Sequence, residues 1–253
     1  MEILQHIGLL AAAFAAGAIN AVAGGGSLIS FPALVAFGFV SKTANVTNTV
    51  ALWPGYVGGS FGYRGELRRQ RRRLLALLPT CAAGAVTGSI VLLSTPESAF
   101  DAIVPFLILF ACGLMAFQDR LSAFAQAHRL ASQGDDRVPV LLLPVTFVLA
   151  IYGAYFGAGL GIVMLAFLSI LLPDDIQHSN ALKGMLSLII NGVAVIYFVA
   201  FGPVRWIAVI VMGSGAVAGG YLGVGVARRL GRTWLRVAVI SYGLVVVAVM
   251  LLR

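Results

Sequence analysis

Long apolar runs separated by short polar stretches make up most of this chain. Ten runs can be placed, and most are about 15–23 residues long, which lets a helix cross a hydrocarbon core of ~30 Å. Two are shorter, 28–39 and 162–172, and each follows a cluster of glycines. The first run exceeds the apolar core of a signal peptide, so we expect it in the mature protein. The pattern predicts an all-α polytopic membrane protein with segments at 3–23, 28–39, 44–63, 74–93, 100–117, 138–156, 162–172, 180–201, 204–227 and 235–252.

Residue patterns repeat between the two halves of the chain. GAVTGS at 84–89 matches GAVAGG at 215–220, and the glycines four residues apart in both favour close helix packing. Two repeats of about five segments are expected, 1–117 and 138–253, with the polar stretch 118–137 as their linker. An odd number of crossings per repeat gives the repeats opposite orientations. The prediction is a pair of inverted repeats, each starting with a helical hairpin broken by glycine, as in many secondary transporters.

The arginines are distributed as inverted repeats require. Six arginines lie within 64–73, between the third and fourth segments, whereas the equivalent connection of the second half has only Arg205 nearby. Conversely, 228–236 is rich in arginine, and its counterpart near 97–101 is acidic. Basic loops face the cytoplasm in most membrane proteins. We therefore expect a cytoplasmic linker at 118–137 and both termini outside, in the inner (plasma) membrane of the cell.

Composition narrows the class of protein. Hydrophobic residues make up 60% of the chain and charged residues 10%, against roughly 45–50% and 25% in soluble domains. The formal net charge of +8 is concentrated in loops, so it indicates topology rather than a nucleic-acid partner. The apolar segments hold no CxxC pair, histidine pair or acidic cluster. No metal, cofactor or catalytic centre is expected, and the chain is not predicted to be an enzyme.

Glycines at membrane depth are the first candidate binding groups. Gly24, Gly25 and Gly26 precede the second segment together with Ser27. Non-helical backbone within a bilayer needs cover from protein or a water-filled cavity. A helix start exposes about four N–H groups and roughly half a positive charge, which suits the oxygens of an anion. The corresponding candidates before the seventh segment are Gly157, Gly159 and Gly161.

Side chains near these turns are the second set of candidates, and each has a structural alternative. Lys183 is the one lysine or arginine placed inside an apolar segment rather than at its edge. It either pairs with a bound anion or extends its ammonium to the membrane interface. Thr47 and Asn48 hold the comparable place in the first half, and Asn191 lies deeper in the eighth segment. The asparagines either donate to an anion or hydrogen-bond between helices.

The motifs of both halves resemble one known family. GGGS at 24–27 and ANVTN at 44–48 are similar to the first repeat of the TauE/SafE family of sulfite and organosulfonate exporters, and 157–161 with 202–223 resembles its second repeat. The resemblance implies a transporter for a small sulfur-containing oxyanion. The chain departs from the family in GAGLG, where three glycines are common, and around Lys183. These departures concern the residues that would select the substrate.

Together these patterns lead to one expected function. We expect an exporter that carries sulfite, sulfoacetate or a related organosulfonate across the lipid bilayer by alternating access. No acidic side chain is predicted deep in a segment, so the membrane potential alone is the expected driving force. The alternatives are an uptake permease or a channel for another small anion. A homo-oligomer is also compatible, because glycine faces serve contacts between subunits as well as within one.

Overall fold

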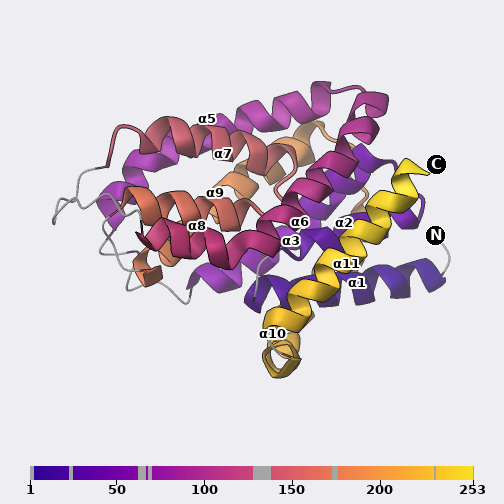
Figure 1. The fold of residues 1–253 in the computed structure, drawn as a ribbon. Coiled ribbons are helices and arrows are strands. Elements are labelled where there is room, and N and C mark those ends of the chain that lie inside the picture. Colours follow the sequence, from indigo (N-terminus) through magenta and orange to yellow (C-terminus); the bar gives the residue numbers. More distant parts are fainter. Residues whose placement is uncertain are drawn as a thin grey trace.

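The computed structural model describes residues 3–22, 25–61, 67, 70–127, 138–172, 176–230 and 232–252. These residues are helical apart from short turns and contain no strand, which confirms the all-helical prediction. Ten helices have defined bounds within them (Figure 1). They are α1 (Ile3–Val22), α2 (Ser27–Ala36), α3 (Ser41–Phe61), α5 (Arg71–Ser94), α6 (Glu97–Ala127), α7 (Leu142–Tyr155), α8 (Leu160–Leu171), α9 (Ile176–Phe201), α10 (Trp206–Leu230) and α11 (Arg232–Leu251).

Several of these helices have the length and hydropathy of membrane spans. Within the described ranges, five helices qualify, in α1, α5, α6, α9 and α11. The chain is therefore a multi-pass membrane protein, as its apolar runs predict. By contrast, α2 has 10 residues and α8 has 12. At 1.5 Å per residue they extend only ~15 Å and ~18 Å, about half of a ~30 Å hydrocarbon core.

Helix α6 is longer than the sequence pattern predicts. The fifth apolar run ends at Phe117, but the helix continues for ten more residues to Ala127. The extension carries Gln118, Asp119 and Arg120, so its hydropathy falls while its helix-forming residues persist. Hydropathy locates the part of a helix that lies in the membrane, not the point where the helix ends. Residues 128–137 of the expected linker lie outside the described residues.

Glycines allow two pairs of helices to approach closely. A Cβ added to Gly219 of α10 would stand closer than 3.0 Å to the backbone carbonyl of Phe14 in α1. A Cβ on Gly88 of α5 would meet the carbonyl of Ile151 in α7 in the same way. Backbone cannot yield as a side-chain end can, so only glycine fits at these contacts. The packing explanation for these glycines is confirmed, and Gly84 and Gly215 make equivalent contacts one turn earlier.

The two glycine-packed pairs lie on opposite sides of the helix bundle. In Figure 1, α5 and α7 run along the top and α1 with α10 occupies the bottom. Helices α3 and α9 pack against each other between them. There the indole Nε1 of Trp53 donates to the Leu188 carbonyl at 3.2 Å. This bond crosses from α3 to α9, so the partly buried Trp53 joins the two helices.

Candidate functional site

The first glycine turn is closed against α1. Gly24 lies outside the described residues, and Gly25 has a φ of +86°, a backbone conformation that favours glycine. The Gly26 N–H donates to Oδ1 of Asn20 at 2.8 Å. A Cβ on Gly26 would stand closer than 3.0 Å to the Ala16 carbonyl. The turn therefore needs glycine for steric reasons, and its Gly26 amide is occupied by Asn20 before Ser27 begins α2.

The second glycine turn joins α7 to α8. Gly157 and Gly159 have φ values of +77° and +78°, so both use the left-handed region that glycine alone enters without strain. The Tyr152 hydroxyl donates to the Ala158 carbonyl and fixes the turn on α7. Gly159 caps α8 without any side-chain hydrogen bond. The start of α8 is thus built from backbone, which leaves its positive end to nearby side chains or ligands.

Lys183 reaches the start of α8. Its Cδ lies 3.8 Å from the position of a Cβ added to Gly161. Its ammonium donates to Oδ1 of Asn180 at 2.6 Å, and the side chain is half-buried. Lys183 is seven residues beyond Ile176, where α9 begins, which is about 10 Å along the helix axis. The structure therefore brings Lys183 and Gly161 together, two candidates that lie in different helices.

Asn48 contributes a buried acceptor without a partner. Its side chain is 3% exposed, and its Oδ1 has no hydrogen bond within the described part of the chain. The Ser187 hydroxyl of α9 is also buried and lacks a partner among the described residues. A buried polar atom left unpaired costs about 1–3 kcal/mol. Such atoms call for water or a ligand as a partner, so Asn48 is a candidate for contact with a transported molecule.

Other candidate side chains are used within the protein. Asn191 donates to the Ser187 carbonyl of its own helix at 2.8 Å. The Thr47 hydroxyl accepts from the backbone N–H of Arg205 at 3.2 Å. Asn45 donates to the Tyr155 carbonyl at 2.8 Å, joining α3 to the end of α7. Asn45 therefore bonds between helices, the structural alternative stated for the asparagines, whereas the bond of Asn191 lies within α9 and that of Thr47 joins α3 to the residue before α10.

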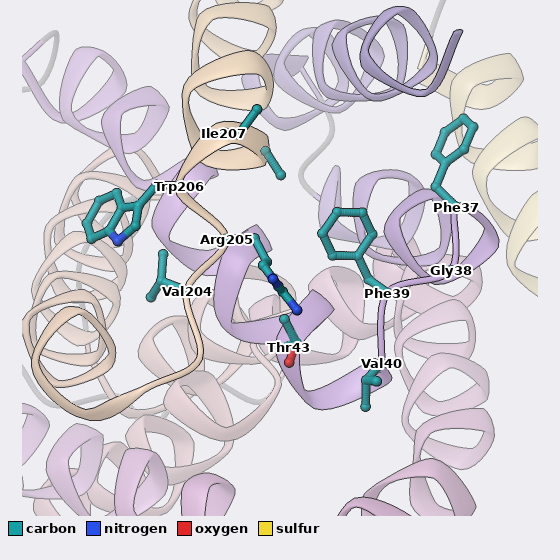
Figure 2. Close-up of a pocket in the computed structure, with 10 residues that line it drawn as sticks. Phe37, Gly38, Phe39, Val40, Thr43, Val204, Arg205, Trp206 and Ile207 are labelled. Atoms are coloured by element: carbon teal, nitrogen blue, oxygen red, sulfur yellow. The ribbon is translucent and has the colours of Figure 1, made fainter. Parts of the chain in front are cut away.

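A cavity opens between two connections that are far apart in the sequence. It has a volume of about 510 Å³ and lies where 37–43 meets 204–208. Figure 2 shows Arg205, Thr43 and Trp206 around it. Sequence reasoning used Arg205 only as a marker of topology. The signal that was available is that Arg205 stands alone in its connection, directly after Pro203-Val204 and before an aromatic residue.

A protein metal site usually needs three or more ligand side chains close together. Across the described residues, no group of three His, Cys, Asp or Glu side chains is placed to hold a metal ion. Lys183 lies beside the amide of Asn180 at the start of α9, and at a separate place Arg205 lines the cavity together with the hydroxyl residue Thr43. These are donors to oxygen atoms, and either place is suited to holding an oxyanion.

Comparisons with known proteins agree with a transport role. The sequence profile of the family described as Sulfite exporter TauE/SafE matches residues 9–250. A probable membrane transporter protein of Haemophilus influenzae is 27% identical over 243 residues, covering 96% of this chain and 92% of that protein. A probable membrane transporter protein, ORF9, of a Sinorhizobium species is 28% identical over 218 residues, covering 85% and 80%. No solved structure matches the chain significantly.

Proposed function

The chain belongs to the sulfite exporter TauE/SafE family of membrane transporters, and we propose that it exports a small sulfur-containing oxyanion by alternating access. The observation that carries the proposal is the approach of Lys183 to Gly161. A cation beside a helix start combines an ammonium with the positive end of the α8 dipole. Sulfite and sulfonates offer the oxygen atoms that such a site binds.

Two inverted halves are proposed as the moving parts. The helix packing supports this, because α1 packs on α10 as α7 packs on α5. In the proposed repeat, α1 corresponds to α7 and α5 to α10, so the two contacts exchange under a two-fold axis. The glycine contacts support the same axis, since Gly84 and Gly88 match Gly215 and Gly219. Short helices after glycine turns in both halves, α2 and α8, are typical of substrate sites near the midplane.

The proposed topology puts both termini outside and the 118–137 linker in the cytoplasm. Contacts between helix ends support it, because each joins residues that the topology assigns to the same face. On the proposed inner face, Gln70 donates to the His178 carbonyl at 2.8 Å. On the proposed outer face, the Lys42 ammonium donates to the Leu93 carbonyl at 3.4 Å. The start of α1 and the end of α11 also lie on the same side in Figure 1.

Membrane potential is the proposed driving force for export. An anion leaving an inside-negative cell gains about 2.3 kcal/mol per charge per 100 mV. Among the described residues, no Asp or Glu side chain is buried. Export driven by potential does not need a carboxylate that couples transport to protons or sodium. The proposal therefore predicts transport that follows the potential and ignores a proton gradient.

Counterflow in proteoliposomes tests the proposed function. Vesicles loaded with unlabelled sulfite should take up labelled sulfite in a saturable way, and sulfoacetate outside should compete. Valinomycin with a potassium gradient then sets the potential, and the net flux of anion should follow its sign. Absence of saturable exchange for both anions would reject the proposal. Net flux that follows a pH gradient and not the potential would reject its driving force, and currents far above carrier rates would indicate a channel.

A further inference from the structure

The cavity between 37–43 and 204–208 concentrates positive potential. Arg205 lines it with a guanidinium, and none of its ten lining residues is acidic. Two helices begin at its wall, α3 at Ser41 and α10 at Trp206. Each helix start carries roughly half a positive charge. The cavity therefore receives a full cationic side chain and two helix dipoles, with no carboxylate among its lining residues to neutralise them.

A threonine side chain lines the same cavity. Thr43 lines the cavity and is 9% exposed. The described residues offer its hydroxyl no hydrogen-bond partner. Its oxygen keeps some accessible surface, because it is not one of the fully buried unpaired atoms of the described residues, so water or a ligand in the cavity can pair with it. This observation is independent of the charge argument and indicates an occupant that accepts hydrogen bonds.

We propose that this cavity binds a small organic sulfonate at the outer mouth of the transport path, with Arg205 as its cationic anchor and Thr43 as a neutral donor. The guanidinium presents paired N–H groups that match two oxygens of one sulfonate. The choice of ligand rests on the proposed function, which supplies the sulfur-containing anion and the outward direction. The existence of an oxyanion site rests on Arg205, Thr43 and the two helix starts alone.

The size and walls of the cavity favour a sulfonate that carries carbon over bare sulfite. Its volume of about 510 Å³ falls within the range of roughly 300–1,000 Å³ typical of small-molecule sites. Phe39 and Trp206 line the cavity with apolar surface, whereas the Phe37 ring packs against Gly8 of α1. An anion with a short carbon chain can place its oxygens on Arg205 and its carbons against the rings of Phe39 and Trp206. Bare sulfite would leave most of this apolar surface in contact with water.

A hydrogen bond links the wall of the cavity to a buried residue of α3. The backbone N–H of Arg205 donates to the Thr47 hydroxyl of α3, and Thr47 is fully buried. Asn48, with its unpaired buried acceptor, is the next residue along α3. An anion held by Arg205 therefore contacts the connection that fixes α3 relative to α10. This outer site is then the last binding site that the anion occupies before its release to the outside.

Fluorescence of Trp206 offers a direct test, because this indole lines the cavity. The full chain in neutral detergent is titrated with sulfoacetate in a chloride-free buffer. The difference between the wild-type signal and that of Trp206→Phe isolates Trp206 from Trp53 and Trp234. The signal should saturate, and Arg205→Gln should raise the half-saturating concentration at least ten-fold. The half-saturating concentration of Arg205→Lys should lie between those of the wild type and Arg205→Gln, because lysine keeps the charge and lacks the paired N–H groups.

Lys42→Gln is the matched control. It removes one positive charge from the same region, one residue before Thr43, yet Lys42 does not line the cavity. It should change the half-saturating concentration less than two-fold. Equal effects of Arg205→Gln and Lys42→Gln would mean general attraction to a basic surface and would overturn the site. Thr43→Val, which removes only the hydroxyl, should weaken binding while leaving the elution profile on size exclusion unchanged.

Three further outcomes complete the test, and the last two separate this inference from the proposed function. A Trp206 signal that responds to phosphatidylglycerol in nanodiscs and not to sulfoacetate would make the cavity a lipid headgroup site and overturn the inference. Saturable sulfite exchange with an unchanged Trp206 signal in Arg205→Gln would overturn the inference and leave the function standing. If the Trp206 signal is lost in Arg205→Gln but the wild-type protein exchanges no sulfur anion, the inference would stand and the proposed function would be overturned.

Discussion

Arg236 and Asp119 form a two-pronged ion pair that joins α11 to α6. The guanidinium donates from Nη1 and Nη2 to the two carboxylate oxygens at 2.7 Å and 3.0 Å. The Asp119 side chain is 68% exposed, whereas that of Arg236 is 14% exposed. Since Asp119 lies beyond the end of the fifth apolar run and Arg236 near the start of the tenth, the pair sits where one proposed half meets the other on the proposed cytoplasmic face.

Reversal of this ion pair should restore stability that each single change removes. Asp119→Arg places two guanidinium groups together and should lower the thermal midpoint of the detergent-solubilised protein. Arg236→Asp should do the same, and the double reversal should recover most of the loss. Because Asp119 is exposed, the coupling energy should not exceed ~1 kcal/mol. Additive losses in the double mutant would show that the pair contributes nothing to the joining of α6 and α11.

Lys183→Gln should weaken transport of a sulfur oxyanion and leave the fold intact. A hydrogen bond to a charged group contributes about 1.5–3 kcal/mol, so the half-saturating concentration in counterflow should rise at least ten-fold. Arg120→Gln is the control, since Arg120 is exposed on α6 and lies over the Phe117 ring. Both variants should elute as wild type on size exclusion. An unchanged half-saturating concentration for Lys183→Gln would support the alternative that Lys183 extends to the membrane interface.

Alanine at the glycine contacts should destabilise the protein wherever its methyl group meets a backbone carbonyl of the neighbouring helix. Gly88→Ala and Gly219→Ala each place a methyl group against a backbone carbonyl, so α5 must separate from α7, or α10 from α1. Gly113→Ala is the matched control, because nothing lies within 4 Å of a Cβ at that position in α6. Thermal melts should show losses for Gly88 and Gly219 only. A similar loss at Gly113 would attribute the effect to glycine itself and not to the helix contact.

The apolar pattern was sufficient to predict the helices because burial in lipid requires long apolar segments whatever their partners. It also predicted the close contacts of Gly88 and Gly219, because glycines four apart leave a smooth face on any helix. It could not predict the cavity, because Thr43 and Arg205 meet only through the packing of α3 against α9 and α10. Nor could it predict that Asn20 occupies the Gly26 amide, since that bond depends on how the turn closes.

Asn48 tests whether a residue that transport requires lowers the stability of the folded protein. Its Oδ1 is buried and unpaired among the described residues, so removing the amide should relieve a cost of about 1–3 kcal/mol. Asn48→Leu is therefore expected to keep or raise the thermal midpoint. If a water of the transported anion donates to this acceptor, or the anion itself accepts from the amide N–H of Asn48, the same change should lower the exchange rate at least ten-fold.

Asn45→Leu provides the comparison for Asn48→Leu, one helical turn away on α3. It removes a formed hydrogen bond to the Tyr155 carbonyl and leaves that carbonyl without its donor, so the thermal midpoint should fall. Opposite changes in midpoint, combined with lost exchange in Asn48→Leu, would identify Asn48 as a position kept for function at a cost in stability. If Asn48→Leu instead melted early like Asn45→Leu and kept its exchange rate, Asn48 would be a packing residue. The transported anion would then have to find its neutral donors elsewhere on α3 or α9.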